Sequence, residues 1–197
     1  AFIRIGTNTW SSEIRIQAPD DQANDQFGYS VSIDGDYVII GAPFEDQIHS
    51  DSGAAYIFRR TGSTFDAGVK LIPSDVLSYN FGHSVDIDGD YAIVGAPFDD
   101  TNGQNAGSAY IFRRIGTNTW DTGREIEGID LVSDDFFGWS VGISGDYAII
   151  GVKDDHAISS NSGSVYLYVR TGTNTWEILN KLVSSDIQAF DLFGFSV

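Results

Sequence analysis

The chain of 197 residues contains no cysteine and no methionine, and only four of its residues are proline. Without cysteine it can form no disulfide, no zinc–thiolate site and no thiol nucleophile. Basic residues are also scarce, because 11 Lys and Arg stand against 28 Asp and Glu and leave a formal net charge of −17. A field of this sign repels nucleic acid and anionic lipid, so we expect neither as a partner.

Long apolar runs are missing as well. No run approaches the roughly 18 residues that a membrane-spanning helix requires, so we expect no membrane insertion. Hydrophobic residues still make up 42% of the chain and aromatic residues 13%, which is typical of a folded domain with one sizeable core. No stretch has a convincing helical period, which favours an all-β fold. Because position 1 is not methionine, we expect a processed chain or a segment of a longer one.

An internal repeat runs through the whole chain. The string Phe-Gly-x-Ser-Val begins at Phe27, Phe81, Phe137 and Phe193, at spacings of 54, 56 and 56 residues. Between these anchors the order of signals is fixed: Gly-Asp-Tyr, then Gly-Ala-Pro, a polar loop, an aromatic strand and Gly-Thr-Asn-Thr-Trp. The N-terminal residues closely match those at 112–120. Such periods are the signature of solenoids and propellers, so we treat residues 1–197 as one repeat domain.

Each unit reads as four short antiparallel strands. Residues 29–34 alternate between polar and apolar, as in a half-buried strand, and a tight Asp-Gly or Ser-Gly turn follows each such strand. Residues 37–41, 91–95 and 147–151 are apolar throughout, which indicates strands buried on both faces. A third strand carries alternating aromatic residues, and a fourth follows the tryptophan. The pattern predicts β-propeller blades whose neighbours bury each other's faces.

The Phe-Gly and Gly-Ala-Pro pairs resemble FG-GAP repeats over essentially the whole chain, in the calcium-loop-free variety of secreted proteins. The resemblance implies about 3.5 repeats of a larger, seven-bladed ring like that of integrin α-subunits. It also implies an extracellular or cell-surface setting and binding through the loops, without enzymatic activity. We expect each phenylalanine to fill the space between blades and each glycine to permit close approach. The residues with these structural roles are Phe27, Gly28, Gly41, Pro43, Phe81, Gly82, Gly95, Pro97, Phe137, Gly138, Phe193 and Gly194.

The third unit departs from this pattern, since Gly151-Val152-Lys153 stands in place of Gly-Ala-Pro. Without proline, a rigid turn after the second strand is not expected there. The lysine could instead neutralise Asp154 and Asp155, which follow it directly.

Calcium is the one metal that the composition suggests. Integrin repeats bind it in a long acidic loop between the first and second strands, whereas here a two-residue turn replaces that loop. The polar loop between the second and third strands offers oxygens but no alternating Asp ladder. A solvated turn built from Asx hydrogen bonds is therefore the favoured interpretation, with a weak calcium site as the alternative and no other cofactor. The candidate ligands are Asp46, Asp51, Asp99, Asp100, Asn102, Asp154 and Asp155.

Aspartates also recur shortly before each Phe-Gly pair. Their similar offsets favour a structural role, with carboxylates accepting backbone N–H bonds in the link between blades. They are Asp20, Asp25, Asp75, Asp130, Asp135, Asp186 and Asp191.

The sequence gives little indication of a catalytic site. His49, His83 and His156 lie at non-equivalent or loop positions, and His83 fills the x of Phe-Gly-x-Ser-Val, where other units carry an aromatic residue. Packing is the favoured role of His83 over that of a general base. The acids recur by unit, whereas a hydrolase needs an asymmetric pair. No catalytic residue is therefore assigned, and a hydrolase with an acidic pair at one rim stays an alternative.

Ligand-binding residues are harder to find. Trp10, Trp120 and Trp176 could stack on sugars, although a tryptophan at a fixed place in each blade more often packs the sheet edge. We therefore expect a non-catalytic adhesion or scaffold module that presents its loops to a protein or glycan. The alternatives are a structural subunit of a surface assembly or filament and a sugar-binding lectin.

The repeat also bears on closure of the ring. The predicted strands are fifteen: two at the N-terminus, twelve in three complete units, and one first strand that ends at Val197. Such a set leaves a gap within a sheet and an open edge with unpaired backbone groups. We expect further copies or segments of the same propeller to cover these edges.

Overall fold

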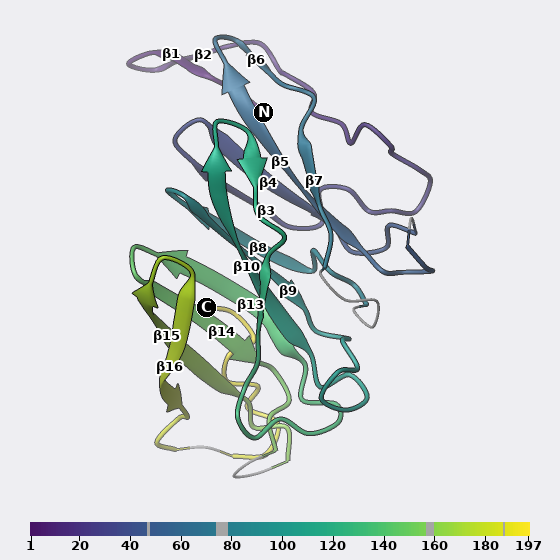
Figure 1. Cartoon of the computed structure of the whole chain (residues 1–197), viewed down its shortest axis with the longest axis vertical. Helices are drawn as coiled ribbons and strands as arrows, with labels where there is room; N and C mark the ends of the chain where they lie inside the picture. Colours follow the sequence, from purple (N-terminus) through teal and green to yellow (C-terminus); the bar gives the residue numbers. More distant parts are fainter. Residues whose placement is uncertain (47, 74–78, 157–159, 187) are drawn as a thin grey trace.

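The computed structural model describes every residue except 47, 74–78, 157–159 and 187. The described residues form sixteen β-strands and no helix. A two-stranded hairpin precedes three antiparallel sheets, called blades 1, 2 and 3 (Figure 1). The predicted all-β fold, with four-stranded antiparallel units, is confirmed. No helix in the described part of the chain could cross a membrane.

The strands follow chain order within each blade. The N-terminal hairpin consists of β1 (Arg4–Gly6) and β2 (Thr9–Trp10). Blade 1 consists of β3 (Val31–Asp34), β4 (Tyr37–Ala42), β5 (Ala54–Thr61), β6 (Thr64–Phe65) and β7 (Val69–Leu71). Blade 2 consists of β8 (Ser84–Asp88), β9 (Tyr91–Ala96), β10 (Ser108–Gly116), β11 (Thr119–Trp120) and β12 (Arg124–Ile126). Blade 3 consists of β13 (Phe137–Ser144), β14 (Tyr147–Val152), β15 (Ser164–Gly172) and β16 (Thr175–Leu182).

The fourth strand differs between blades. In blades 1 and 2 it is divided into two short pieces, and both pieces pair with the long third strand. In blade 3 it is the single strand β16, whose pairing with β15 shifts register twice. The sequence pattern predicts where the fourth strand begins, but it does not predict that this strand is divided in blades 1 and 2.

The core lies between blades. The second strands β4 and β9 are buried along their whole length, as their continuous apolar sequence requires. Ile39 and Ile57 of blade 1 join Val85 and Ile87 of blade 2 in one cluster, and an equivalent cluster lies between blades 2 and 3. Fully burying one such side chain contributes about 1.5–3 kcal/mol. Face-to-face packing of neighbouring blades is therefore the main stabilising contact.

The Phe-Gly pairs lie where one blade joins the next. Phe81 is fully buried, its ring 5.4 Å from that of Tyr110 and 5.9 Å from that of Phe112. A parallel bridge joins Phe81 to Gly53 of the preceding blade. Gly82 has φ +93°, and a Cβ there would stand 2.3 Å from the Ala54 carbonyl oxygen. Phe137 is buried in the same way, whereas Phe27 and Phe193 at the two ends of the series are more exposed.

The turn after the second strand is the same in all three blades. The backbone N–H of Glu45 donates to the Ala42 carbonyl, and that of Asp99 to the Ala96 carbonyl, around the buried Pro43 and Pro97. In blade 3 the N–H of Asp155 donates to the Val152 carbonyl over 3.5 Å, with Lys153 in the place of proline. The third unit therefore keeps this turn without proline, although its hydrogen bond is long.

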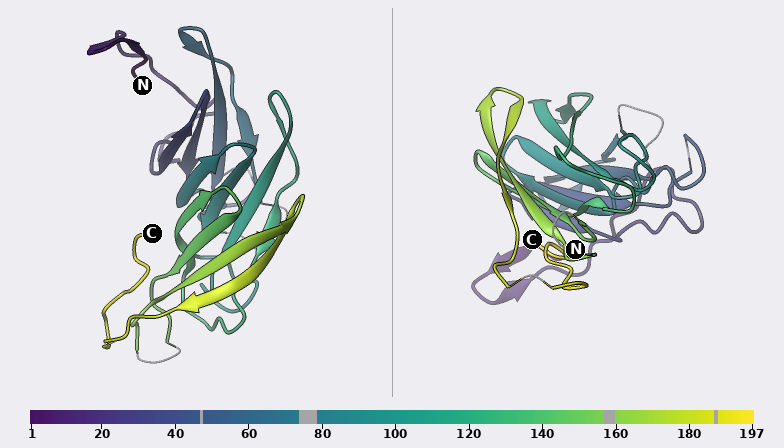
Figure 2. Two further views of the ribbon diagram at one scale, coloured as in Figure 1. Left: turned by 90° about the vertical axis from the view of Figure 1, so that its left-hand side faces the viewer. Right: turned by 90° about the horizontal axis from the view of Figure 1, so that it is seen from below.

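The three blades are stacked one after another, and the first strands lie side by side at one edge (Figure 2). We call this edge the inner edge. At the C-terminus the first strand expected to end at Val197 does not form. Phe193 makes only an isolated bridge to Gly163, because this segment has no second strand beside it among the described residues.

Candidate functional site

Each blade has two distinct ends. At the loop end lie the described residues of the connections β4–β5, β9–β10 and β14–β15, together with the segments that lead into Phe27 and Phe137. At the turn end lie the two-residue turns after the first strands and the hairpins β5–β6, β10–β11 and β15–β16. The loop end carries nearly all the candidate polar residues.

A half-buried lysine organises the loop end of blade 1. Lys70 of β7 places its Nζ 2.7 Å from Asp20 Oδ2 and 2.8 Å from Glu45 Oε1. The Tyr56 hydroxyl donates to Asp20 Oδ1 over 2.8 Å. Partial burial raises the pKa of Asp20, but the hydrogen bonds from Lys70 and Tyr56 outweigh it and hold that pKa below its usual value. The link before Phe27 is thereby fastened to the sheet.

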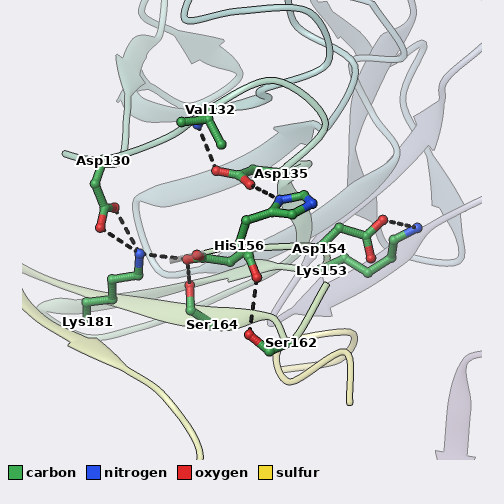
Figure 3. Close-up of polar contacts among 10 residues, drawn as sticks. Asp130, Val132, Asp135, Lys153, Asp154, His156, Ser162, Ser164 and Lys181 are labelled. Carbon is green, nitrogen blue, oxygen red and sulfur yellow. Dashed lines mark hydrogen bonds and ion pairs between the residues drawn. The ribbon is translucent and has the colours of Figure 1, made fainter. Parts of the chain in front are cut away.

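Blade 3 repeats this arrangement with equivalent residues. Figure 3 shows Lys181 reaching Asp130, and its Nζ lies 2.8 Å from Asp130 Oδ2 and 2.6 Å from Asp155 Oδ2. The hydroxyl of Ser164 donates to Asp155, and that of Tyr166 donates to Asp130. Burial, and then the hydrogen bond to Asp130, raise the pKa of Tyr166. The lysine is thus held between two carboxylates.

Blade 2 departs from the other two at the same place. Glu125 pairs across the sheet with Tyr110, as Lys70 does with Tyr56 and Lys181 with Tyr166. The Tyr110 hydroxyl donates to Asp99 Oδ2 over 3.1 Å, and Ser108 donates to Glu125 Oε1 over 2.8 Å. The position equivalent to Asp20 is residue 74, which lies outside the described residues. A carboxyl group therefore stands where its neighbours carry an ammonium group.

Three of the aspartates before the Phe-Gly pairs accept backbone N–H groups, as their offsets predict, whereas Asp20 and Asp130 bind a tyrosine and a lysine. Asp25 accepts from Gln22, Asp135 from Val132 and Asp191 from Gln188. Asp75 lies outside the described residues, and Asp186 accepts from the hydroxyl of Ser184.

Asp135 also lies 2.9 Å from Nδ1 of His156 (Figure 3). Burial raises the pKa of Asp135 even though His156 and the Val132 N–H act against it. This pair comes from neighbouring segments of the loop end, whereas the other two histidines make different contacts: His49 packs against Tyr79, and His83 belongs to the inner edge. It therefore has no second histidine beside it among the residues that the structure describes.

The candidate calcium ligands bind their own loops or a lysine. Asp46 Oδ1 accepts from the Asp51 N–H, Asp99 Oδ1 from the Thr101 N–H, and Asp100 Oδ1 from the Asn105 N–H, each over 2.8 Å. Asp155 pairs with Lys181, and Asn102 is exposed. Asp154 lies 3.4 Å from Lys153, as the sequence of this loop suggests (Figure 3). Among the described residues no three acidic, His or Cys side chains gather as a metal site.

An aromatic row crosses the blades at the inner edge of the loop end. It is formed by the residue after each Phe-Gly pair: Tyr29, His83, Trp139 and Phe195. Ring centroids lie 5.1 Å apart between Tyr29 and His83, and 4.6 Å apart between His83 and Trp139. Trp139 and Phe195 are 5.8 Å apart. Tyr29 and Phe195 are exposed and the middle pair half-buried, so the row presents ring surface to solvent.

Hydrogen bonds fix the row at its centre. His83 Nδ1 lies 3.2 Å from the Trp139 carbonyl oxygen, which can only accept, so Nδ1 carries the proton. In the neutral ring Nε2 then accepts from the Tyr29 hydroxyl, 3.2 Å away. Burial lowers the pKa of His83 more than the Trp139 carbonyl raises it, and Lys153 lowers it further.

Lys153 and Phe136 extend this row. The Lys153 Nζ lies 4.0 Å from the centre of the Trp139 ring and 4.8 Å from that of Phe136. Phe136 itself has φ +59°, a left-handed backbone conformation that bulky residues rarely adopt. The same left-handed conformation occurs at Gln26, Asn80 and Leu192, the equivalent residues before the other Phe-Gly pairs. The conformation therefore belongs to the repeat, and what distinguishes blade 3 is an aromatic ring at this position with a cation packed against it.

The three tryptophans proposed for sugar stacking differ in their exposure to solvent. Trp120 and Trp176 are buried between blades, where each packs edge-on against a tyrosine of the preceding blade. Neither ring is open to a sugar, because the neighbouring blade covers it. Trp10 is exposed, since no blade precedes its hairpin in the structure.

The sequence of the chain matches a known repeat at three places. The profile of the FG-GAP repeat matches residues 10–58, 66–112 and 120–168. The chain belongs to the FG-GAP repeat family. Each matched FG-GAP segment begins near the fourth strand of one sheet and ends in the third strand of the next, so the repeat links neighbouring blades covalently. No curated protein matches the chain.

Sequence reasoning missed two features of this FG-GAP site. Lys70 and Lys181 were not singled out, although both stand at one position of the fourth strand in a chain with few basic residues. The aromatic row was noticed only as packing at His83. The sequence pattern that could have predicted the row is the ring-bearing residue at the x of every Phe-Gly-x-Ser-Val string.

Proposed function

We propose that this chain is a non-catalytic binding module that works at the cell surface or outside the cell. The aromatic row and Lys153 form its binding surface, and the partner is a protein or a glycan. The observation that carries the proposal is the stacking of four consecutive repeat positions into one continuous, partly exposed surface. Aromatic side chains bury large areas at small entropic cost, which suits them to binding.

The chemistry of the row favours a partner with flat apolar faces and polar edges. Sugar rings and the side chains of an extended polypeptide both meet this description. Lys153 packs over the Trp139 ring and is paired with Asp154, so it leaves this part of the surface less acidic than the surrounding loops. The surrounding acidic loops would reject partners of high negative charge.

The disposition of the acids supports a binding role rather than catalysis. Asp20 and Asp130 each bind a tyrosine and a lysine, in two blades alike. Such contacts fasten loops to sheets, whereas an acid–base pair requires two carboxyl groups with different protonation behaviour facing a common substrate. Asp135 and His156 are the exception to this repetition.

Fluorescence titration tests the proposal. In a Trp10→Phe background, Trp139 is the tryptophan at the loop end, and the buried Trp120 and Trp176 give a constant signal at the turn end. We would titrate neutral and uronic-acid oligosaccharides and purified extracellular matrix proteins. At least one should change the fluorescence, and Tyr29→Ala should weaken its binding about tenfold, a loss of about 1.4 kcal/mol. Binding that is unaffected by Tyr29→Ala, or no response to any of these probes, would contradict the proposal.

A further inference from the structure

A tyrosine–tryptophan contact joins successive blades at the turn end, and it occurs twice. Tyr37 of β4 meets Trp120 of β11 with ring centroids 6.4 Å apart and planes at 83°. Tyr91 of β9 meets Trp176 of β16 with centroids 5.7 Å apart and planes at 82°. In each case the tyrosine belongs to one blade and the tryptophan to the hairpin of the next. The two contacts are therefore copies of a single interblade joint.

Three further contacts accompany the aromatic pair. Arg114 stacks over the Tyr37 ring at 4.4 Å, and the Tyr37 hydroxyl donates to the Thr117 carbonyl over 2.5 Å. Asn118 Nδ2 donates to Asp66 Oδ2 over 2.8 Å. In the second joint Arg170 stacks over Tyr91, Tyr91 donates to the Thr173 carbonyl, and Asn174 donates to Asp121. Each joint thus combines a tyrosine and an acid on one blade with a Thr-Asn-Thr-Trp hairpin on the next.

The same two halves are present, unjoined, at the ends of the structure. The hairpin β1–β2 pairs Arg4 with Trp10, as β10–β11 pairs Arg114 with Trp120, and both hairpins carry the same register shift. Yet Trp10 is 59% exposed, whereas Trp120 is 8% and Trp176 5% exposed. Tyr147 of β14, the equivalent of Tyr37 and Tyr91, is 52% exposed against 9% and 7%.

We infer that the N-terminal hairpin of one copy of this chain docks on the Tyr147 face of a second copy through this joint. Trp10 takes the place of Trp120 on the tyrosine, and Arg4 stacks over its ring. The Thr7 carbonyl accepts from the Tyr147 hydroxyl. Asn8 donates to Glu177, which follows Trp176 as Asp121 follows Trp120.

A second copy fits this face better than other occupants because the hairpin carries the same Gly-Thr-Asn-Thr-Trp sequence that fills the two internal joints. The hairpin and blade 3 lie at opposite ends of the molecule (Figure 1). The docking is therefore between copies, and it is head-to-tail. Such heterologous contacts generate rings where the rotation closes and filaments where it does not.

Charge sets the conditions under which the contact forms. Two copies with a formal charge of −17 each repel one another at long range. At 0.15 M salt the Debye length is about 8 Å, so this repulsion is largely screened while the joint itself forms at short range. Self-association should therefore strengthen as salt is raised.

Sedimentation velocity with complementary variants tests the inference on the full 197-residue chain. Trp10→Ala removes the hairpin half, Tyr147→Ala removes the face, and each variant alone should be monomeric where the wild type associates. Mixed in equal amounts they should form dimers and nothing larger, because the Tyr147 face of the Trp10 variant meets the hairpin of the Tyr147 variant. Each substitution should weaken self-association at least tenfold.

Folding controls accompany this experiment. Both side chains are exposed, so the thermal midpoints of the two variants should match that of the wild type. A wild type that stays monomeric at millimolar protein in 0.3 M salt overturns the inference. Association that persists in either variant, or a mixture of the two variants that forms no dimer, also overturns it. Either result would mean that the N-terminal hairpin and the Tyr147 face do not bind each other.

Discussion

Gly95 lies directly against the carbonyl oxygen of Gly138, across the boundary between blades 2 and 3. A Cβ atom on Gly95 would stand only 2.0 Å from that oxygen. The same oxygen accepts a hydrogen bond from the Ser84 hydroxyl over 2.8 Å, so it cannot move away freely. The glycine of each Gly-Ala-Pro motif is therefore required by the close approach of two blades.

Replacing this glycine should separate the blades. Gly95→Ala should lower the free energy of unfolding by about 3 kcal/mol, because the backbone of the next blade must shift to make room. Gly116→Ala is the matched control, since its nearest neighbour is the Thr119 side chain at 3.4 Å and its φ is not positive. It should cost less than about 0.5 kcal/mol in urea unfolding. Equal costs at the two positions would mean that the close approach relaxes readily.

Phe81 should be the most sensitive residue of its Phe-Gly pair. It is fully buried against Tyr110 and Phe112, so Phe81→Ala leaves a cavity between blades and should cost about 3–5 kcal/mol. Tyr79, two residues earlier, is 38% exposed and packs against His49. Tyr79→Ala should cost under about 1 kcal/mol. A comparable loss at both positions would remove the special role of the phenylalanine.

Local features of this fold could be predicted from the sequence because they depend on neighbouring residues. The turn at Gly35, with φ +53°, follows from Asp-Gly between two apolar segments. The buried strand β4 follows from its unbroken apolar run. Features that depend on partners far along the chain could not be predicted. Lys70 meets Asp20, and nothing in either segment specifies the other, so this ion pair appears only in the structure.

The tryptophans show the same limit. Trp10 and Trp120 occupy the same hairpin sequence with the same register, yet one is exposed and the other buried. The difference comes from the presence or absence of a preceding blade, which the local sequence does not encode. Tertiary surroundings, rather than residue type, decide whether such a ring can meet a ligand.

Calcium should not stabilise the chain. The two-residue turns after the first strands are too short to wrap a cation, and Asp46, Asp99 and Asp100 bind their own loop backbones. Thermal unfolding with 1 mM EDTA and with 1 mM CaCl₂ at constant ionic strength should give midpoints within about 1 °C of each other; a bound ion at 100 times its Kd would add about 2.7 kcal/mol. A rise of several degrees at micromolar Ca²⁺ would reveal a site in these loops.

Lys181 should be needed to keep two carboxylates at the loop end of blade 3. Lys181→Met leaves the buried Asp155 without its counter-charge, which should cost about 2–4 kcal/mol at pH 7. Arg60→Met is the control, because Arg60 and Asp36 form an exposed surface pair worth under about 1 kcal/mol. Chemical unfolding at pH 7 measures both. Partial burial raises the pKa of Asp130, but the hydrogen bonds from Lys181 and Tyr166 outweigh it and hold that pKa below its usual value. The stability that comes from the Asp130 carboxylate is therefore present above about pH 4 and is lost as the pH falls through its folded-state pKa.

His83 should make the stability of the wild type depend on pH. Its neutral ring satisfies both nitrogens, with Nδ1 donating to the Trp139 carbonyl and Nε2 accepting from Tyr29. A proton on Nε2 removes that acceptor and adds a charge to a half-buried ring beside Lys153. The folded-state pKa is accordingly lowered from its usual value, chiefly by burial. The unfolded chain therefore binds the proton first, and stability falls as the pH drops below about 6.5 towards the folded-state pKa.

Substituting phenylalanine isolates this effect, because Phe195 occupies the equivalent position in the last repeat and shows that the ring fits. At pH 7.5, His83→Phe should lose about 1 kcal/mol through the missing hydrogen bond to Trp139. As the pH is lowered to 5, the wild type should lose stability faster, so the difference between the two proteins narrows or reverses. His49→Gln, at a residue whose ring lies beside Tyr79 and the Ser50 carbonyl rather than in the aromatic row, should follow the wild type throughout. If the stability difference between wild type and His83→Phe stays constant from pH 7.5 to 5, His83 has the same pKa in the folded and the unfolded chain, and the prediction is wrong.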